Sequence, residues 1–481
     1  MNIPKLRKAL NEHKISALEL TEVYIKRIKK YNKKLNCYIT VCEDEAIETA
    51  KKAQEIIDRG DGGILTGIPV SIKDNICTKG IKTTCASKML CDFVSVYDAT
   101  VSGKLKNSFS VMLGKTNMDE FGMGSTSQNS YYGGVRNPYN LDYVSGGSSG
   151  GAASSVSAKL CVASLGTDTG GSIRLPASFC GVTGLKPTYG TVSRYGLIAF
   201  ASSFDQIGVC ANSAIDCACV LDTIYGVDKN DLTTSNKAKG GYTSKTDKTL
   251  KGIKIGIPKE FFDDGIDDGV KSAILNAISY YKTMGCEIVE CSIPSLEYAL
   301  SAYYIISSAE ASSNLSRFDG IRFGFRSEKD INFNDLIKHS RSEGFGDEVK
   351  RRIMLGNYVL SSGYYDEYYN RAQKICKKLK EEYAQIFKMC DVILTPTAPT
   401  TAYRIGEMEN NPVKMYLGDI YTVSANITGL PAISTTCGYD ENGMPIGMTL
   451  VGRPFDECTI IGLCDCFEKD FEKKEAVAYE L

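Results

Sequence analysis

The sequence predicts an α/β protein, and three observations lead to this fold class. The chain has 481 residues, of which 43% are hydrophobic and 23% are charged, as in an average soluble globular protein. Short apolar runs alternate along the chain with segments that have helical periodicity. Around residue 270 a strand, a helix and a second strand follow one another, which is the order of a βαβ unit.

The N-terminal region, residues 1–60, is expected to form helices that pack on the rest of the chain. Within it, residues 3–30 place apolar side chains at helical spacing among many lysines, and Ser16 is the expected N-cap of the second of two amphipathic helices. A further helix is expected over residues 267–285. Strands are expected in five apolar runs, residues 67–74, 109–117, 252–258, 285–294 and 391–397.

One polar stretch interrupts these elements. Residues 226–251 carry almost no apolar side chains and are predicted to form a long surface loop. A domain boundary in this loop is one interpretation. We favour a single domain over residues 1–481, because the candidate catalytic and binding residues described below lie on both sides of the loop.

Charge, hydropathy and cysteine content exclude several functions. The 56 Lys and Arg balance 57 Asp and Glu, so no global basic field draws the chain to nucleic acid, although a local basic patch remains possible. Neither a signal peptide nor an apolar run near the roughly 20 residues that span a bilayer is found, so we expect a cytoplasmic protein with no membrane partner. The 18 cysteines include no CxxC pair, which favours reduced thiols and no metal site.

Small residues dominate residues 145–158, which are almost entirely Gly, Ser and Ala. This composition is typical of a flexible linker, but the patterned sequence on both sides favours a place where backbones approach closely. Farther along, Gly170 and Gly171 directly precede Ser172. Successive glycines permit a turn whose N–H groups point inward, an arrangement that stabilises an oxyanion.

Two short motifs resemble other catalytic signatures. Residues 114–116 read GKT, but a P-loop requires glycine where this chain has Phe109. Residues 146–150 fit the G-x-S-x-G nucleophile elbow, which needs a preceding strand and a later histidine. The chain has only two histidines, of which His13 lies in a polar connection and His339 in a charged segment. A Ser-His-Asp hydrolase is therefore a weakly supported alternative.

Lys73 is the candidate base for a serine nucleophile that works without histidine. It lies at the end of an apolar run, where a strand would deliver it into the interior. A lysine with an ordinary pKa is neutral in only about one molecule in a thousand at pH 7.4, and burial raises that share. An exposed position paired with Asp74 is the alternative interpretation.

Two segments together resemble the signature of the amidase family. Residues 146–158 read GGSSGGAASSVSA, and residues 164–190 read SLGTDTGGSIRLPASFCGVTGLKPTYG. Lys73 and Ser148 are 75 residues apart and Ser148 and Ser172 are 24 apart, which matches the Ser-Ser-Lys triad of that family. The resemblance extends from about residue 3 to residue 465 and implies the amidase-signature fold, a mixed central β-sheet covered by helices on both faces.

The resemblance also implies a role for each catalytic residue. Ser172 is the expected nucleophile and Lys73 the terminal base. Ser148, which follows a cis peptide bond in this family, is expected to pass protons between them. The expected oxyanion hole consists of backbone N–H groups at Thr169, Gly170, Gly171 and Ser172.

Further segments resemble one branch of the family, the glutaminase subunits of tRNA-dependent amidotransferases. They are residues 314–324, 342–369, 395–402, 429–434 and 443–457. The resemblance implies that Arg352 holds the α-carboxylate of glutamine and that Asp419 holds its α-ammonium group. Tyr303 is a third expected substrate contact, with its neighbour Tyr304 as the alternative position.

The same resemblance implies partners for this chain, the B and C subunits of a heterotrimer. The chain would hydrolyse glutamine through an acyl-ester intermediate and supply ammonia to the B subunit. That partner would use ATP and Mg²⁺ to amidate misacylated Glu-tRNA(Gln) or Asp-tRNA(Asn), so no cofactor is expected in this chain, which has no nucleotide-binding motif. A free-standing amidase for small amides and an inactive assembly scaffold are the alternatives.

Three positions depart from the family pattern. Gln128 stands where Glu is usual, and Ser145 and Val209 each replace a proline. None of the three belongs to the triad. Gln128 is expected near the site, where its missing charge bears on the handling of protons or ammonia.

Overall fold

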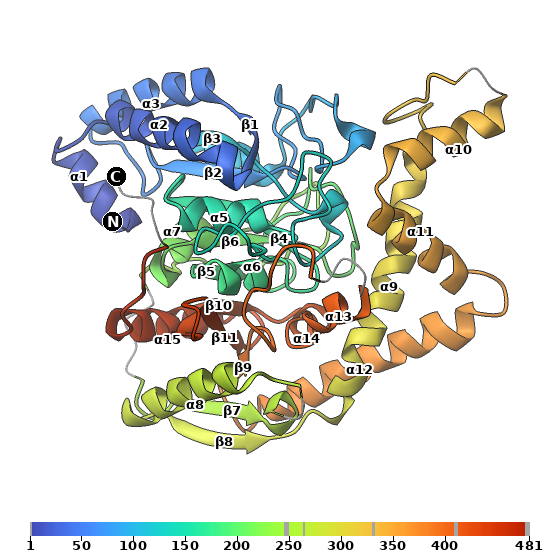
Figure 1. Cartoon of the computed structure of the whole chain (residues 1–481). Coiled ribbons are helices and arrows are strands. Elements are labelled where there is room, and N and C mark those ends of the chain that lie inside the picture. Colours follow the sequence, from blue (N-terminus) through green and yellow to red (C-terminus); the bar gives the residue numbers. More distant parts are fainter. Residues whose placement is uncertain (1, 245–249, 263–264, 330–331, 408–411, 477–481) are drawn as a thin grey trace.

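Eleven strands form one mixed β-sheet, in the order β1-β3-β2-β4-β6-β5-β10-β11-β9-β7-β8 (Figure 1). The computed structural model describes residues 2–244, 250–262, 265–329, 332–407 and 412–476. The strands are β1 (Tyr38–Val41), β2 (Pro69–Lys73), β3 (Val111–Thr116), β4 (Ala163–Asp168), β5 (Thr183–Lys186), β6 (Gln206–Ala211), β7 (Lys254–Pro258), β8 (Glu287–Cys291), β9 (Val392–Pro396), β10 (Ala432–Tyr439) and β11 (Pro445–Gly452).

Parallel and antiparallel pairings are combined in this sheet. β2 lies parallel to β3 and β4, and β7 lies parallel to β8 and β9, whereas the other neighbouring strands are antiparallel. The five predicted strands are present as β2, β3, β7, β8 and β9. Helix α8 (Asp268–Thr283) connects β7 to the parallel strand β8, so the expected βαβ unit and the α/β class are confirmed.

Helices cover the sheet on both faces. Side chains alternate along a strand, so positions 447 and 452 of β11 point to opposite sides. A Cβ atom at Gly447 would lie 2.4 Å from Ser178 Oγ of one helix, and one at Gly452 would lie 2.9 Å from Ile460 of another. These helices, α6 and α15, therefore pack on opposite faces, as the amidase-signature fold requires.

The remaining elements complete this arrangement. The α-helices are α1 (Ile3–Asn11), α2 (Ala17–Leu35), α3 (Glu43–Asp58), α4 (Thr100–Asn107), α5 (Gly150–Ser157), α6 (Arg174–Phe179), α7 (Ala214–Ile224), α8 (Asp268–Thr283), α9 (Ala299–Asn314), α10 (Phe333–Gly344), α11 (Asp347–Val359), α12 (Asn370–Ile386), α13 (Pro412–Leu417), α14 (Val423–Thr428) and α15 (Glu457–Asp470). Short 3-10 or π turns are η1 (Lys88–Leu90), η2 (Glu120–Gly122), η3 (Lys259–Phe262), η4 (Pro294–Tyr298), η5 (Leu315–Arg317) and η6 (Tyr365–Tyr369). Helices α9 to α12 form an arm at one side of the molecule, on the right in Figure 1.

The N-terminal helices begin as their sequence predicts. Ser16 caps α2, because its hydroxyl accepts the Glu19 N–H at 3.1 Å while the Ser16 N–H donates to Glu19 Oε2 at 2.9 Å. His13 lies in the turn before this helix, where 63% of its side chain is exposed. No helix within the described ranges is both long enough and apolar enough to cross a membrane.

The polar segment between α7 and β7 has neither an α-helix nor a strand of the sheet in its described residues. Residues 245–249 of the predicted loop lie outside the described residues. Tyr242 and Leu250 are buried, so parts of the segment lie against the core. The sheet contains strands from both sides of this segment.

Parallel pairing brings two chain segments to the same edge of the sheet. β2 ends at Lys73, and its parallel neighbour β4 ends at Asp168. The carboxyl ends of parallel strands lie side by side, so the side chains that follow them share one region. The small-residue segments that begin α5 and α6 lie at this edge.

Candidate active site

Lys73 is buried at the end of β2, with no exposed surface. Its ammonium nitrogen lies 2.8 Å from each of three hydroxyl oxygens, those of Ser148, Ser149 and Thr167. Asp74 turns away from it and pairs with Lys115 at 3.6 Å. Of the two interpretations of Lys73, the structure therefore has the buried one.

Burial changes the acid strength of Lys73. Loss of water around the amine lowers the pKa of Lys73 to about 7, although the carboxylates of Asp119 and Asp168 act in the opposite direction. A neutral amine has one lone pair and must accept a hydrogen bond from one of its three hydroxyl neighbours. The Ser149 hydroxyl already donates to Thr167 O at 3.0 Å, so Ser148 is a neighbour that can give its proton to Lys73.

The small-residue segment is a packed turn and helix, so it is not a flexible linker. The peptide bond between Gly147 and Ser148 is cis. The helix that follows, α5, is buried along nearly its whole length. A Cβ atom at Gly151 would lie 2.3 Å from Asn117 O, so only glycine permits this approach of two backbones.

Ser172 lies in the turn between β4 and α6, and 8% of its surface is exposed. Its carbonyl oxygen accepts the Ser149 N–H at 3.0 Å, which joins the two small-residue segments. Within the described residues no hydrogen bond uses the Ser172 hydroxyl, which therefore does not contact Ser148 Oγ at hydrogen-bond distance. The structure thus joins Lys73 to Ser148, and the Ser172 hydroxyl has no partner in the part of the chain that is described.

The Gly170–Gly171 turn offers only some of its expected donors. The Gly171 N–H donates to Asp168 Oδ1 at 2.9 Å, so it does not face a substrate. Within the described residues no hydrogen bond uses the N–H groups of Thr169, Gly170 or Ser172. In this conformation these three groups, and not that of Gly171, are available to an oxyanion.

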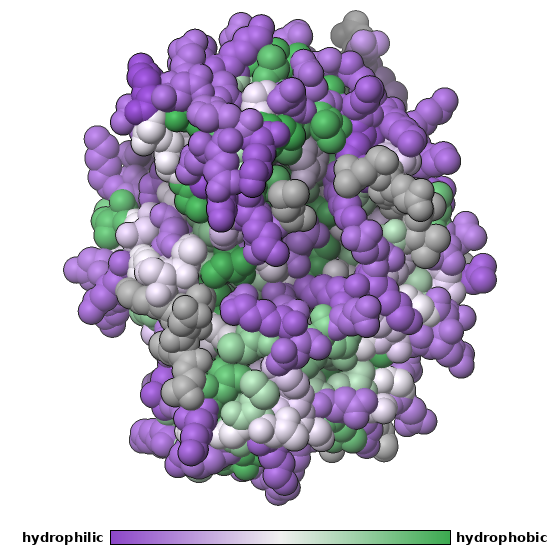
Figure 2. All heavy atoms as spheres, turned by 90° about the vertical axis from the view of Figure 1, so that its left-hand side faces the viewer, coloured by the Kyte–Doolittle hydropathy of each residue, from purple (hydrophilic) through white to green (hydrophobic). Residues whose placement is uncertain are grey.

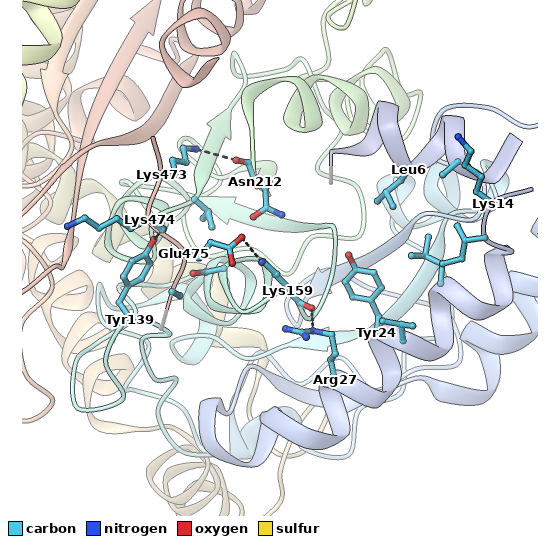
Figure 3. Close-up of a pocket in the computed structure, with 18 residues that line it drawn as sticks. Leu6, Lys14, Tyr24, Arg27, Tyr139, Lys159, Asn212, Lys473, Lys474 and Glu475 are labelled. Carbon is cyan, nitrogen blue, oxygen red and sulfur yellow. Dashed lines mark hydrogen bonds and ion pairs between the residues drawn. The ribbon is translucent and has the colours of Figure 1, made fainter. Parts of the chain in front are cut away.

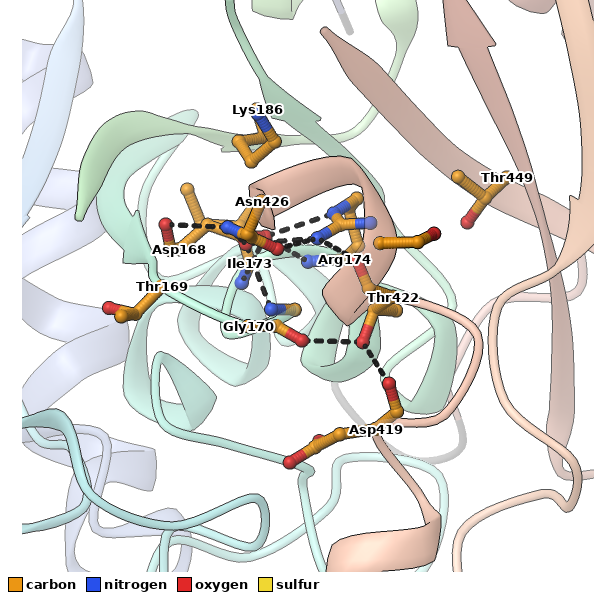
Figure 4. Close-up of polar contacts among 12 residues, drawn as sticks. Asp168, Thr169, Gly170, Ile173, Arg174, Lys186, Asp419, Thr422, Asn426 and Thr449 are labelled. Carbon is orange, nitrogen blue, oxygen red and sulfur yellow. Dashed lines mark hydrogen bonds and ion pairs between the residues drawn. The ribbon is translucent and has the colours of Figure 1, made fainter. Parts of the chain in front are cut away.

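Asp168 anchors this turn through a buried network (Figure 4). Its carboxylate accepts hydrogen bonds from Arg174 Nε at 3.1 Å and Nη2 at 3.0 Å. Asn426 Nδ2 also donates to Asp168 Oδ1, at 2.9 Å. Burial alone would raise the pKa of Asp168, but the Arg174 guanidinium holds it well below its ordinary range. The roles of Asp168, Arg174 and Asn426 were not expected from the sequence.

Asp419 is buried in a polar enclosure. Its carboxylate accepts hydrogen bonds from the Ser125 hydroxyl at 2.9 Å to each oxygen and from Tyr304 Oη at 2.8 Å. Burial raises the pKa of Asp419 to about 6, even though both hydroxyls favour its charged form. A cation placed beside this carboxylate would relieve the cost of burying it.

Arg352 projects from α11 and is 3% exposed. Its Nε donates to Glu348 Oε1 at 2.7 Å, and its guanidinium lies over the rings of Tyr304 and Tyr416, 4.5 Å and 4.8 Å from their centroids. Its Nη1 is buried without a hydrogen-bond partner among the described residues. A buried guanidinium nitrogen without a partner is suited to bind a carboxylate.

Tyr303 and Tyr304 lie side by side on α9 and contact different parts of the site. Tyr304 contacts both Asp419 and Arg352. Tyr303 packs on the glycine turn, since a Cβ atom at Gly170 would lie 2.5 Å from its ring. Of the two neighbours, Tyr304 thus contacts the charged residues. The Tyr-Tyr pair in the sequence indicated a tyrosine contact in the site but did not distinguish the two positions.

Other candidate residues lie apart from this site. His339 is on α10, with 41% of its side chain exposed and Glu343 3.8 Å away. The 18 cysteines all lie within the described residues and form no disulfide, and most of them are buried. Among the described residues there is no group of three or more His, Cys, Asp or Glu side chains that could hold a metal ion. Gln128, in contrast, lines a pocket together with Glu348, the partner of Arg352, and its Nε2 donates to Val135 O at 2.8 Å.

A groove of about 690 Å³ between the N-terminal helices and the C-terminal segment contains none of the predicted site residues. Figure 2 views this side of the molecule, where apolar residues lie in a hollow between hydrophilic rims. Lys159 in this groove pairs with Glu475 at 2.7 Å, and Lys473 donates to Asn212 O at 3.2 Å (Figure 3).

Several known proteins are similar to this chain in sequence and in structure. The family model described as Amidase matches residues 19–461. The A subunit of glutamyl-tRNA(Gln) amidotransferase from Ruminiclostridium cellulolyticum is 52% identical over 475 residues, which cover 98% of each chain. The crystal structure of the protein of the same name from Thermotoga maritima is 38% identical with a TM-score of 0.83, covering 99% of this chain and 98% of that one. Peptide amidase from Stenotrophomonas maltophilia is 26% identical with a TM-score of 0.85, covering 100% and 99%.

Proposed function

We propose that this chain, which belongs to the amidase family, is the glutamine-hydrolysing subunit of a tRNA-dependent amidotransferase. The relatives at about half identity over nearly the whole chain are named as the A subunit of such an enzyme. The buried Lys73–Ser148 contact and the neighbouring Ser172 support an amide-hydrolysing site within it.

The proposed reaction proceeds in two halves. Neutral Lys73 accepts the Ser148 proton as Ser148 accepts the Ser172 proton, and Ser172 Oγ forms a bond to the amide carbon of glutamine. The oxyanion is held by the free N–H groups of the glycine turn. The C–N bond then breaks, the proton returns to the leaving nitrogen, and ammonia departs from a γ-glutamyl ester. Water attacks this ester by the same proton path in reverse and releases glutamate.

One observation favours glutamine over a neutral amide: the enclosure presents a buried cation and a buried anion together. Among the described residues, Arg352 Nη1 has no hydrogen-bond partner, and the Asp419 carboxylate is bonded only to the hydroxyls of Ser125 and Tyr304. Tyr304 contacts both, Asp419 through its hydroxyl and Arg352 through the face of its ring. Free glutamine carries an α-carboxylate and an α-ammonium group, which would pair with Arg352 and Asp419 respectively.

The relatives are named as the A subunit of an amidotransferase, which supports a complex of several subunits. We propose that ammonia passes to a B subunit that uses ATP and Mg²⁺ to amidate misacylated Glu-tRNA(Gln) or Asp-tRNA(Asn), and that a C subunit completes a cytoplasmic heterotrimer. The net charge of −1 agrees with tRNA being held mainly by a partner.

A variant of the nucleophile in the assembled complex tests this proposal. Ser172→Ala should abolish glutamine-dependent amidation of misacylated tRNA but retain amidation when ammonium is supplied, because the ATP-dependent step is untouched. In the wild-type protein, hydroxylamine should release an acyl group from a peptide that contains Ser172.

Two outcomes would contradict the proposal. Loss of the ammonium-dependent reaction in Ser172→Ala would mean that this chain shapes the tRNA site itself. Full activity of the lone chain on simple neutral amides, without a preference for glutamine, would identify a free-standing amidase, which is the second candidate.

A further inference from the structure

We propose that Thr422 is a positioning residue that couples the Asp419 site to the oxyanion turn by fixing the peptide between Gly170 and Gly171. This inference rests on the proposed glutamine hydrolysis for its link to substrate binding. Thr422 directly precedes α14 and is fully buried. It lies 252 residues from Gly170 in the sequence, so no local pattern connects the two.

The peptide between Gly170 and Gly171 is held at both ends. Its carbonyl oxygen accepts the Thr422 hydroxyl at 2.6 Å, and its N–H donates to Asp168 Oδ1 at 2.9 Å. Gly171 has a φ of 131°, in a region that other residues rarely adopt. A peptide between two glycines rotates easily, so its orientation depends on these two hydrogen bonds.

The orientation of this peptide decides which N–H groups face the substrate. In the observed state the Gly171 N–H points to Asp168, and those of Gly170 and Ser172 remain free. Without the bond from Thr422, the Gly170 carbonyl would be buried without a partner, and rotation of the peptide would redirect it. A carbonyl oxygen turned toward the substrate would repel the oxyanion that the turn is proposed to stabilise.

The same threonine is bonded to the Asp419 segment. Its hydroxyl also lies 3.1 Å from Asp419 O, and its N–H donates to that oxygen at 3.0 Å (Figure 4). Its own carbonyl accepts Arg174 Nη2 at 3.0 Å, which ties it to the Asp168 network. The carboxylate proposed to bind the substrate ammonium and the turn proposed to bind the oxyanion therefore belong to one hydrogen-bonded unit.

Thr422→Val tests this coupling, because it removes the hydroxyl and keeps the branched shape. We expect kcat for glutamine to fall about 10- to 100-fold, the range that follows from one lost hydrogen bond with a buried carbonyl left unpaired. KM should change by less than about threefold, since the groups that bind the substrate remain. Thr422→Ser, which keeps the hydroxyl, should restore most of kcat.

Thr428→Val is the matched control. Among the described residues, the Thr428 hydroxyl donates only to Ser424 O within α14, at 2.7 Å, so its loss should leave kcat unchanged. Thermal unfolding of all three variants establishes that they are folded. A kcat of Thr422→Val within about twofold of wild type, or Thr422→Ser as impaired as Thr422→Val, would overturn the inference.

The two proposals can fail separately. If the wild-type complex does not hydrolyse glutamine, the proposed function fails, and the same three variants are then compared on a neutral amide such as hexanamide. Any amide hydrolysed by Ser172 uses the oxyanion turn, so the loss in Thr422→Val and its recovery in Thr422→Ser should persist. Equal rates for the three variants on that amide would overturn the inference independently.

Discussion

The rate of glutamine hydrolysis as a function of pH tests Lys73 as the base. Burial lowers the pKa of Lys73 to about 7, so its neutral fraction is roughly 10% at pH 6 and roughly 90% at pH 8. If proton acceptance by Lys73 limits acylation, kcat should rise about tenfold between these values and then level off. A lysine with its ordinary pKa would instead give a rate that still rises above pH 9.

Glutamate release by the assembled complex is the assay, with kcat and KM fitted separately at each pH. This separation matters because Asp419 is proposed to bind the substrate ammonium group, so its ionisation should change KM. Lys73→Ala should lower kcat by about 10²- to 10⁴-fold, the usual contribution of a general base. His339→Ala is the control, since its side chain is 41% exposed and distant from the triad contacts. A flat kcat between pH 6 and pH 8, or an equal loss in His339→Ala, would refute the reasoning.

Two further predictions concern the charged groups of the site. Arg352→Met and Asp419→Asn should each raise KM for glutamine by about tenfold or more, because each leaves a substrate charge unpaired. KM for a neutral amide should hardly change. Equal effects on both substrates would assign these residues to the fold alone. Asp168→Asn should lower the free energy of unfolding by about 3–5 kcal/mol, because Arg174 would keep a buried charge without its carboxylate. Since the pKa of Asp168 is depressed in the folded state, its contribution is present above about pH 4 and lost as the pH falls further. Denaturant unfolding of wild type and variant measures both effects, and coincident curves would contradict them.

Sequence patterns predicted the strands that stand between clear turns and helices. β7, α8 and β8 form one local unit, and each has its own periodicity. β4 was missed because its residues, ASLGTD, are mostly small or polar and form no apolar run like that of β9, although all six are buried. Its Gly166 permits close approach of Ser149 and Ile173, which is a packing requirement that no single-strand pattern reports. Strand order likewise depends on distant pairs such as Ser434 with Gly184.

In the candidate site, too, the sequence identified some features, and others depend on the three-dimensional fold. The spacing of Lys73, Ser148 and Ser172 is a sequence property, and resemblance to a family was enough to select them. Their hydrogen-bond partners come from the three-dimensional fold, so the contribution of Ser125 to the Asp419 enclosure had no signal in the sequence. Asp168 and Arg174 did have a signal in the sequence. Two opposite charges six residues apart in a run of small and apolar residues are expected to pair when buried.

The charges around Lys73 provide the last test, because its pKa reflects a balance between burial and nearby carboxylates. The Asp119 carboxylate is the strongest single charge that raises the pKa of Lys73, and that of Asp205 is weaker. Both aspartates are buried and accept backbone N–H groups, at 2.9 Å from Ser127 for Asp119 and at 2.9 Å from Phe200 for Asp205. Asp119→Asn should therefore move the midpoint of the kcat profile below pH 7, and Asp205→Asn should move it less. Because both variants lose a similar buried carboxylate, a general loosening of the fold would shift the two midpoints equally, and that result would contradict electrostatic control of Lys73 by Asp119.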